Sequence, residues 1–364
     1  EFGSVEVIPD QQLSPGVVKD VDILLVRSTR PINKELLAGS KVKFVGTATI
    51  GYDHVDLAYL QQQGIAFSAA PGSNANSVAE YITAALLELA HSFQFELKNK
   101  ILGVIGVGNV GSKVVQKAQA LGMRVLLNDP PRQEKTGETK FVPLTQIYEA
   151  DLITIHVPLT REGKYPTYQL VNQDFLHKIK PEAIIINSSR GAVIEEKSLF
   201  SSLVAKKLRA VVLDVWNNEP TINLELLKKT FLGTPHIAGH SFDGKVNGTL
   251  MLYQAVCCFL QKEPCWDPSA LLPPPPQPEI ILEKKSTGQE TIRWLVKQVY
   301  NIWQDDQNLR KILKLPLKQQ GEYFRYLRKN YPIRREFFNT RVRISTSEPE
   351  LIKSIKMLGF NVLV

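Results

Sequence analysis

Residues 101–129 read ILGVIGVGNVGSKVVQKAQALGMRVLLND. A continuous apolar run, residues 101–105, leads into the spacing Gly106-x-Gly108-x-x-Gly111, and the helix-like run 112–121 follows. Glycine at these places permits a tight turn, lets a phosphate approach the backbone and lets the helix pack close to the strand. The N-terminus of that helix offers free N–H groups and a positive dipole end to an anion. The pattern predicts a dinucleotide-binding turn formed by Gly106, Gly108, Asn109, Val110 and Gly111.

An acidic residue ends the next apolar run. Asp129 lies 18 residues after Gly111, at the end of RVLLND, residues 124–129. A carboxylate at this place accepts hydrogen bonds from the adenosine ribose hydroxyls and repels a 2′-phosphate, which favours NAD over NADP. Arg132 is evidence for the opposite choice, because an arginine can accommodate a 2′-phosphate. We predict that Asp129 binds the ribose and that the cofactor is NAD.

Short apolar runs alternate with amphipathic segments on both sides of the glycine turn. Continuous apolar strands separated by helices, such as the helix predicted over residues 79–93, indicate parallel sheets covered on both faces. The fold class is therefore α/β, with two doubly wound, Rossmann-like domains, residues 1–97 and 98–240. The predicted strands are residues 21–26, 42–46, 65–68, 101–105, 124–128, 152–156, 183–187 and 210–215.

A proline-rich segment separates these domains from the C-terminal part. Residues 273–278 read PPPPQP, and consecutive prolines fix φ and exclude a helix or a central strand. We therefore predict a linker over residues 273–280 and a small α+β module over residues 281–364. Within the module we expect helices at residues 291–303, 318–330 and 348–358, and strands at 341–345 and 360–364.

The composition excludes several classes of protein. Hydrophobic residues make up 43% of the 364 residues and charged residues 22%, which is typical of a globular chain rather than a disordered one or a coiled coil. No apolar run approaches the ~20 residues of a membrane span, so we expect no membrane partner. The three cysteines, Cys257, Cys258 and Cys265, form no disulfide framework, which predicts a cytoplasmic location.

The positive charge is concentrated in the C-terminal module. Residues 281–364 carry 17 basic and 8 acidic side chains, whereas residues 1–280 carry 27 and 28, and the whole chain has a net charge of +8. A solvated basic face, an anionic small substrate and nucleic acid are all compatible with this distribution. The chain contains no nucleic-acid-reading motif, so we expect no nucleic-acid partner.

Three ionisable residues follow successive strand-like segments. Arg190 comes after AIIINSS, Glu219 after AVVLDVWNN, and His236 lies in GTPHIAGH. Because ligands and catalytic groups gather at the carboxyl ends of strands in open α/β sheets, these side chains can converge on one crevice. Each of them alone is weak evidence, but their combination with a dinucleotide turn indicates an active site.

The oxidation of an alcohol by NAD requires such a set of groups. A hydride and a proton leave the substrate, and a histidine with a pKa near 7 can accept the proton. A carboxylate on its other ring nitrogen fixes the tautomer and stabilises the imidazolium, and an arginine can bind a carboxylate or a carbonyl oxygen. We assign His236 as the acid/base, Glu219 as its partner and Arg190 as the substrate-orienting cation. No Cys/His cluster has metal-ligand spacing, so no metal is predicted.

The motifs GVGNVG, INSSRGAVI, LDVWNNEP and TPHIAG together resemble the NAD-dependent D-2-hydroxyacid dehydrogenases. The resemblance implies the catalytic order Arg, Glu, His at the three positions assigned above. The stretches KFVGTATIGYDHVD, HIAGHSFDGKVNGT and LRKNY resemble members that carry a C-terminal module and act on a small phosphorylated 2-hydroxy acid. In these members the module serves dimerisation, so the resemblance implies a homodimer formed through residues 281–364.

The resemblance also assigns domains and further site residues. Residues 1–97, rejoined by about 241–272, would bind the substrate, and residues 98–240 would bind NAD. The first strand and helix of the family have no counterpart in residues 1–97. His240 stands where the family usually has tyrosine. The implied cofactor contacts are Val157, Asp214 and Gly239, the implied substrate contacts are Ser28, Thr49 and His240, and the candidate phosphate-binding cations are Arg27, Lys245, Arg334 and Arg335.

Two other interpretations remain open at this point. The chain could be another D-2-hydroxyacid dehydrogenase, for example of the phosphoglycerate type, because the catalytic residues would be unchanged. It could also be an NAD-sensing co-regulator of the same fold, which binds partners without catalysis.

Overall fold

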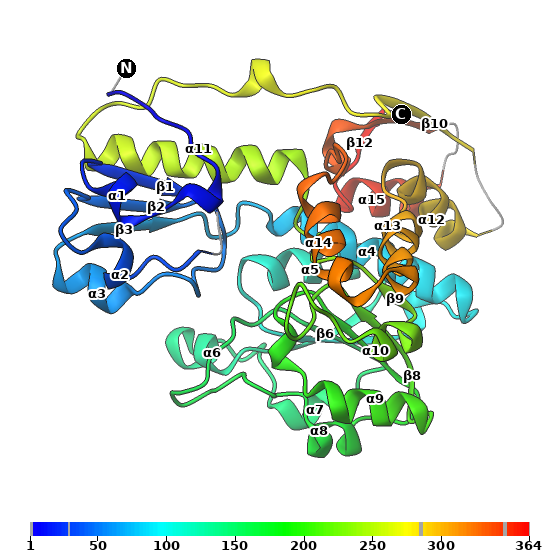
Figure 1. Ribbon diagram of the computed structural model, residues 1–364. Helices are drawn as coiled ribbons and strands as arrows, with labels where there is room; N and C mark the ends of the chain where they lie inside the picture. Colours follow the sequence, from blue (N-terminus) through cyan, green and yellow to red (C-terminus); the bar gives the residue numbers. More distant parts are fainter. Residues whose placement is uncertain (1–2, 28–29, 284–286, 345–347, 364) are drawn as a thin grey trace. The chain divides into compact units, whose positions relative to one another are not determined.

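The computed structural model describes residues 3–27, 30–283, 287–344 and 348–363 (Figure 1). The chain forms two compact units. Unit 1 consists of Glu1–Asn74 and Asp243–Leu272, and unit 2 of Ala75–Phe242 and Pro273–Val364. This division differs from the predicted boundaries, because the helix that follows Asn74 and the C-terminal module both pack within unit 2.

Unit 1 contains a three-stranded parallel sheet in the order β1-β2-β3. Val26 and Val45 on the sheet share an apolar core with Val18, Ile32 and Leu60. The elements are α1 (Pro15–Val18), β1 (Ile23–Val26), α2 (Lys34–Leu37), β2 (Phe44–Thr47), α3 (Leu57–Gln62), β3 (Ala66–Ala69) and α11 (Phe242–Phe259). At the end of α11, the ring of Phe259 lies 5.2 Å from that of Phe44, so this returning helix packs on the sheet.

Unit 2 contains a six-stranded sheet in the order β5-β4-β6-β7-β8-β9, and every neighbouring pair is parallel. The predicted strands at residues 101–105, 124–128 and 183–187 occur over those residues. The strands are β4 (Ile101–Ile105), β5 (Arg124–Asn128), β6 (Leu152–Ile155), β7 (Ala183–Asn187), β8 (Leu208–Leu213) and β9 (Leu232–Gly233).

Helices cover both faces of this sheet. Alternate residues of one strand serve different faces, since Ile184 belongs to one core cluster and Ile185 to the other. Helices α4 (Ala75–Ser92) and α5 (Asn109–Ala120) lie on one side, and α8 (Gln173–Lys178) and α9 (Glu196–Val204) on the other (Figure 1). The remaining helices before the module are α6 (Pro130–Thr136), α7 (Leu144–Ile147) and α10 (Leu224–Lys229). This arrangement confirms the doubly wound α/β prediction.

The C-terminal module is α+β, as predicted, and it shares its core with α4 and α5. Its parallel strands are β10 (Glu279–Leu282), β11 (Arg341–Ile344) and β12 (Asn361–Leu363). Its helices are α12 (Gly288–Val299), α13 (Ile302–Arg310), α14 (Leu317–Lys329) and α15 (Pro349–Met357). The single helix predicted over residues 291–303 is wrong, because Tyr300 is extended and its buried hydroxyl donates to Asp305, so a new helix begins at Ile302.

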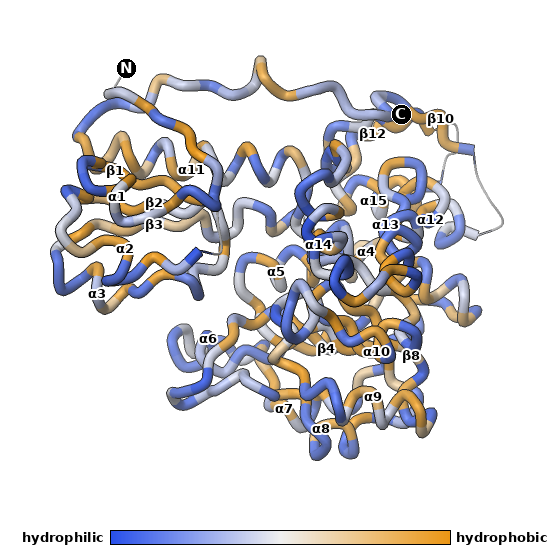
Figure 2. Tube along the Cα trace, in the orientation of Figure 1, coloured by the Kyte–Doolittle hydropathy of each residue, from blue (hydrophilic) through white to orange (hydrophobic). Residues whose placement is uncertain are grey.

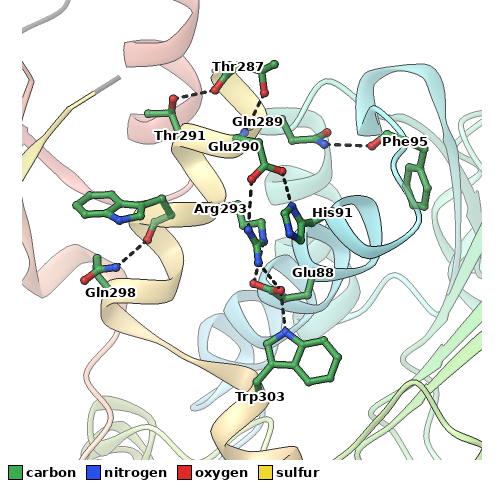
Figure 3. A network of polar contacts seen from close by, with 11 residues as sticks. Glu88, His91, Phe95, Thr287, Gln289, Glu290, Thr291, Arg293, Gln298 and Trp303 are labelled. Atoms are coloured by element: carbon green, nitrogen blue, oxygen red, sulfur yellow. Dashed lines mark hydrogen bonds and ion pairs between the residues drawn. The ribbon is translucent and has the colours of Figure 1, made fainter. Parts of the chain in front are cut away.

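Helix α4 holds the module through polar contacts as well as apolar ones. The buried carboxylate of Glu88 accepts hydrogen bonds from Arg293 Nε at 3.1 Å, from Arg293 Nη2 at 3.0 Å and from Trp303 Nε1 at 2.7 Å (Figure 3). His91 and Glu290 form a neighbouring pair at 3.0 Å. Because the charge of Glu88 is matched by a bidentate arginine, its burial is compensated.

Apolar residues follow the strands of the large sheet, whereas the outer helices carry polar residues on their exposed sides (Figure 2). Among the described residues, no helix is both long enough and apolar enough to cross a membrane.

Candidate active site

The glycine turn is shaped as the sequence predicts. Gly106 has φ +86°, and a Cβ there would lie 2.7 Å from the carbonyl oxygen of His156 and 2.8 Å from Val157 Cγ1. A Cβ on Gly111 would collide with the carbonyl oxygen of Gly106. Gly108 is exposed, and a Cβ there would meet no atom within 4 Å. The close packing at Gly106 and Gly111 and the open space at Gly108 fit a pyrophosphate at the start of α5, where Asn109 and Val110 lie. Val157 lies beside the turn.

Asp129 connects the glycine turn to the end of β5. Its Oδ2 accepts from the N–H of Val107 at 2.8 Å, and its Oδ1 accepts from the N–H of Arg132 at 3.1 Å and so caps α6. The guanidinium of Arg132 donates to the carbonyl of Val107. Arg132 is therefore engaged with the turn itself, which weakens the case that it serves a 2′-phosphate. The contact of Asp129 with a ribose stays a prediction.

His236 and Glu219 form a hydrogen-bonded pair. His236 Nδ1 lies 2.8 Å from Glu219 Oε2, and Glu219 Oε1 accepts from the N–H of Trp216 at 2.9 Å. The two side chains are 32% and 19% exposed, so both are partly shielded from water. Because Nδ1 faces the carboxylate, Nε2 is the ring atom that remains for proton exchange with a substrate.

The pKa of Glu219 lies below its usual range. Burial is the largest single influence and raises this pKa. The neighbouring His236, the N–H of Trp216 and the charge of Arg328 together lower the pKa by more than burial raises it. The carboxylate therefore stays ionised at neutral pH, which stabilises a protonated imidazole on its partner.

A buried aspartate shapes the loop around His236. Asp214, at the end of β8, accepts from the hydroxyl of Thr234 at 2.6 Å and from the N–H groups of Ile237 at 2.8 Å and Ala238 at 2.9 Å. The N–H of His236 donates to the carbonyl of Asp214 at 2.7 Å, and His236 has φ +57°. The loop is thus wound around one carboxylate, and Gly239 follows directly. Cofactor contacts of Asp214 and Gly239 stay predictions.

Arg190 follows β7, the neighbour of β8 in the sheet. The side chain of Asn187 accepts from the N–H of Ser189 at 3.0 Å and donates to the carbonyl of Arg190 at 2.9 Å, which fixes the turn. A Cβ on Gly191 would collide with the backbone of Trp216, so this turn lies against the segment that leads to Glu219. Arg190, Glu219 and His236 thus follow the adjacent strands β7, β8 and β9, as the sequence predicts.

The predicted substrate residues of unit 1 lie near the ends of its strands and on α11. The hydroxyl of Thr49 donates to the carbonyl of Gly51 at 2.8 Å and lies 2.7 Å from that of Thr47. The pKa of Lys245 is lowered, first by burial and second by the nearby charge of Arg27. These two cations are therefore neighbours. Ser28 lies outside the described residues.

Two of the candidate phosphate-binding cations are internal. Arg334 and Arg335 are each only 5% exposed. Arg334 donates to the carbonyls of Ser77 at 2.6 Å and Ala238 at 3.2 Å, and Arg335 donates to the carbonyl of Pro273 and to Asn339. Their assignment to a phosphate is corrected, because both guanidiniums satisfy buried backbone groups.

The sequence interpretation missed the residues of the C-terminal module that reach the loop of His236. Arg334 is one of them, and the ring of Tyr331 lies 5.8 Å from that of His240 in an edge-to-face arrangement. The sequence indicates Arg334 only as a candidate phosphate-binding cation, and it does not predict the contact with the carbonyl of Ala238. Within the part of the chain that the structure describes, no group of three His, Cys, Asp or Glu residues is placed to hold a metal ion.

Two family models match the chain. The NAD binding domain of the D-isomer specific 2-hydroxyacid dehydrogenases matches residues 73–238, and a domain of unknown function, DUF3410, matches residues 271–359. The first match contains the glycine turn, Arg190, Glu219 and His236. The second covers most of the C-terminal module.

The chain is similar to curated proteins over nearly its whole length. It is 42% identical over 362 residues to the erythronate-4-phosphate dehydrogenase of Proteus mirabilis, which is 99% of this chain and 94% of that protein. It is 41% identical over 361 residues to the enzyme of the same name from Escherichia coli, with coverage of 99% and 93%.

Solved structures of related dehydrogenases share the fold. An NAD-bound 3-phosphoglycerate dehydrogenase of Entamoeba histolytica is 28% identical with a TM-score of 0.59, over 70% of this chain and 84% of that one. An NAD-dependent formate dehydrogenase of Staphylococcus aureus in complex with NAD is 25% identical with a TM-score of 0.57, over 70% and 83%. The resemblance found in the sequence is confirmed: the chain belongs to the D-isomer specific 2-hydroxyacid dehydrogenase family, on the branch of the erythronate-4-phosphate dehydrogenases.

Proposed function

We propose that the chain oxidises 4-phospho-D-erythronate to (R)-3-hydroxy-2-oxo-4-phosphooxybutanoate with NAD, as a step of pyridoxal 5′-phosphate biosynthesis. The chain is an NAD-dependent dehydrogenase of the 2-hydroxyacid class. The proposal for the substrate rests on relatives of that name at 41–42% identity over 99% of the chain. The observation that carries the chemistry is the His236–Glu219 pair, with 2.8 Å between Nδ1 and Oε2.

Each catalytic group has a separate task in this reaction. When bound, NAD would supply the acceptor for the hydride of C2 of the hydroxy acid. His236 Nε2 accepts the proton of the C2 hydroxyl, so that a neutral ketone forms instead of a protonated one. Glu219 holds the ring orientation through Nδ1 and stabilises the resulting imidazolium. The planar guanidinium of Arg190 binds the substrate carboxylate or the developing carbonyl oxygen.

The neighbouring cations Arg27 and Lys245 are our candidates for the substrate phosphate. Two adjacent positive charges repel one another, and a bound dianion relieves that repulsion. The lowered pKa of Lys245, caused first by burial and second by Arg27, is consistent with such a site. Thr49, Ser28 and His240 complete the proposed substrate contacts.

We also propose a homodimer that forms through residues 281–364, as the family resemblance implies. Light scattering of the intact chain and of a variant with polar substitutions on the exposed face of this module tests the proposal. The proposed cytoplasmic location is supported by the low number of cysteines, three in 364 residues, which form no disulfide framework.

Turnover on a series of substrates tests the proposed function. The expected order is 4-phospho-D-erythronate well above D-3-phosphoglycerate, with D-lactate lowest, because the phosphate and the chain length are both recognised. The control is His236→Ala, which we expect to lose about 10³-fold in turnover while NAD affinity persists. A preference for D-3-phosphoglycerate contradicts the substrate, and an active His236→Ala variant contradicts the role of the pair. NAD binding without turnover on any hydroxy acid would favour the co-regulator interpretation.

The cofactor preference depends on Asp129. The variant Asp129→Ala should weaken NAD binding about tenfold and leave NADP binding unchanged or improved, because the repulsion of a 2′-phosphate is removed. Fluorescence titration of both cofactors measures the effect. The cap of α6 is also lost, so Asp129→Asn, which keeps a capping oxygen, is the matched control for folding. Equal weakening of both cofactors would contradict the ribose assignment.

A further inference from the structure

The C-terminal module contacts the segment that leads into the loop of His236. Asp306 on α13, which is 3% exposed, accepts from the N–H of Gly233 in β9 at 2.8 Å. Arg310, one helical turn further along α13, pairs with Asp306 at 2.8 Å and donates to the carbonyls of Leu227 and Thr230, both at 2.9 Å. Helix α13 therefore fixes the chain just before the catalytic histidine.

The same module holds the far end of this loop. Arg334 Nη1 donates to the carbonyl of Ala238 at 3.2 Å, and the backbone carbonyl of Arg334 accepts from the N–H of Phe242 at 2.7 Å. The ring of Tyr331 packs edge-on against His240. The loop that carries His236 is thus anchored on both sides by residues from α13 and from the segment after α14.

Helix α14 lies against the segment that carries Glu219. The position of a Cβ on Gly321 is 3.4 Å from Pro220 Cγ and 3.5 Å from Thr221 Oγ1, so the glycine allows close approach beside Glu219. Arg328 lies two helical turns after Gly321, on the same face of α14. Its Nε is buried and has no hydrogen-bond partner among the described residues. The charge of Arg328 acts on Glu219, so this guanidinium lies near the catalytic carboxylate.

We propose that the C-terminal module is part of the catalytic apparatus: α13 and Arg334 anchor the loop of His236, and Arg328 is a positioning residue that keeps Glu219 ionised opposite that histidine. This inference deepens the proposed function and rests on its assignment of the His236–Glu219 pair. It goes beyond a role in dimerisation, because each of these contacts lies within one chain.

The direction of the effect follows from the charges around Glu219. The charges that act on Glu219 are those of His236, after β9, and of Arg328, on α14. Glu196 on α9 lies close by, since it accepts from the N–H of Asn217, two residues before Glu219, at 2.8 Å. Arg328 favours the ionised carboxylate and opposes protonation of the pair. Without it, the pair binds a proton more readily. Because His236 must be unprotonated to accept the substrate proton, the acid limb of kcat/KM moves to higher pH.

The test compares Arg328→Gln with Arg328→Lys and with Arg325→Gln, in the intact protein at saturating NAD. Arg325 is an exposed residue of the same helix and serves as the matched control. For Arg328→Gln we expect kcat/KM at the acid end to fall about threefold to tenfold more than on the plateau. Lysine should restore most of the wild-type profile, and Arg325→Gln should leave it unchanged. NAD affinity, oligomeric state and thermal unfolding are measured on the same samples.

Superimposable pH profiles of wild type and a folded Arg328→Gln variant would overturn the proposal, as would an equal shift in Arg325→Gln. If Arg328→Gln does not fold, Gly321→Leu is the second variant, because it keeps both charges and displaces α14 from Pro220. It should shift the acid limb in the same direction, and an unshifted limb would overturn the proposal. Failure of the proposed function is distinguishable, since the wild type would then show no turnover on the substrate series.

Discussion

Glu219 and Glu80 are two largely buried carboxylates of the same unit, and their environments move their pKa values in opposite directions. Glu219 lies beside the catalytic histidine, and its pKa is lowered although burial acts to raise it. Glu80, on α4 beneath the C-terminal module, is fully buried, and burial raises its pKa to about 8. Glu80 therefore holds its proton at neutral pH, whereas Glu219 does not.

The difference lies in the hydrogen-bond donors and cations around each group. Both oxygens of Glu219 are engaged, one by Trp216 and one by His236. Glu80 Oε1 accepts from Asn76 and from the N–H of Phe337, but Oε2 has no partner in the described part of the chain. The carboxylate of Glu336 also raises the pKa of Glu80. Burial alone thus does not decide the charge of an acid, because the compensating donors decide it.

The largest effect is expected when the charge of the catalytic acid is removed. Glu219→Gln keeps the shape but presents an amide that cannot stabilise an imidazolium, so kcat should fall roughly 10³-fold, about 4 kcal/mol in activation free energy. Steady-state kinetics measures this loss, and NAD binding should persist. The matched control is Glu225→Gln, because Glu225 is an exposed acid of the same unit. A Glu219→Gln variant with near wild-type kcat would show that the charge of Glu219 is not needed for catalysis.

A third buried acid, Glu88, extends the comparison to the stability of the fold. Its partner Arg293 supplies two hydrogen bonds, so Arg293→Met leaves a buried carboxylate with one indole N–H. We expect the free energy of unfolding to fall by about 3 kcal/mol. The double variant with Glu88→Gln should recover part of this loss, since no charge remains buried. Denaturant unfolding measures both, and the exposed Lys297 on the same helix provides the control Lys297→Met. A double variant no more stable than the single one would show that packing, not charge, holds the module.

The sequence is sufficient for those parts of the site that depend on local patterns. The glycine spacing, the apolar strands and the order of Arg190, Glu219 and His236 are visible without coordinates, because strand ends meet at one edge of a parallel sheet. The His236–Glu219 contact joins residues only 17 apart that follow neighbouring strands. Its prediction required only the topology and the chemistry of hydride transfer.

The sequence is insufficient where the structure depends on contacts between distant segments. The bond from Arg334 to the carbonyl of Ser77 joins residues 257 apart, and no periodicity reveals it. A positive tail predicts exposed cations, yet Arg334 is buried because backbone carbonyls satisfy it. For the same reason α4 was predicted with the first domain. Its burial beneath the C-terminal module, which begins some 200 residues later, is a tertiary property.

The smallest expected effect concerns Glu80, and its sign follows from proton linkage. Since the folded pKa of about 8 lies above the unfolded value of 4.5, the protonated acid stabilises the fold fully below pH 4.5. That stability is lost as the pH rises through the folded pKa. Glu80→Gln mimics the protonated form and does not titrate, so its stability relative to wild type should grow by roughly 2 kcal/mol between pH 5 and pH 6.5.

Denaturant unfolding of wild type and Glu80→Gln at several pH values measures this difference. The buried amide of the variant adds a cost, because Oε2 of Glu80 has no partner among the described residues that could accept from an amide N–H in its place. This cost does not change with pH. The exposed Glu322 provides the control Glu322→Gln, for which the difference should stay flat. The charges of Lys117 and Arg334 act to lower the pKa of Glu80. If the Glu80→Gln difference is also flat, these two cations compensate the charge of Glu80 as fully as His236 and Trp216 compensate that of Glu219. The two acids would then differ only in exposure, and the contrast between a charged and an uncharged buried carboxylate would not hold for this fold.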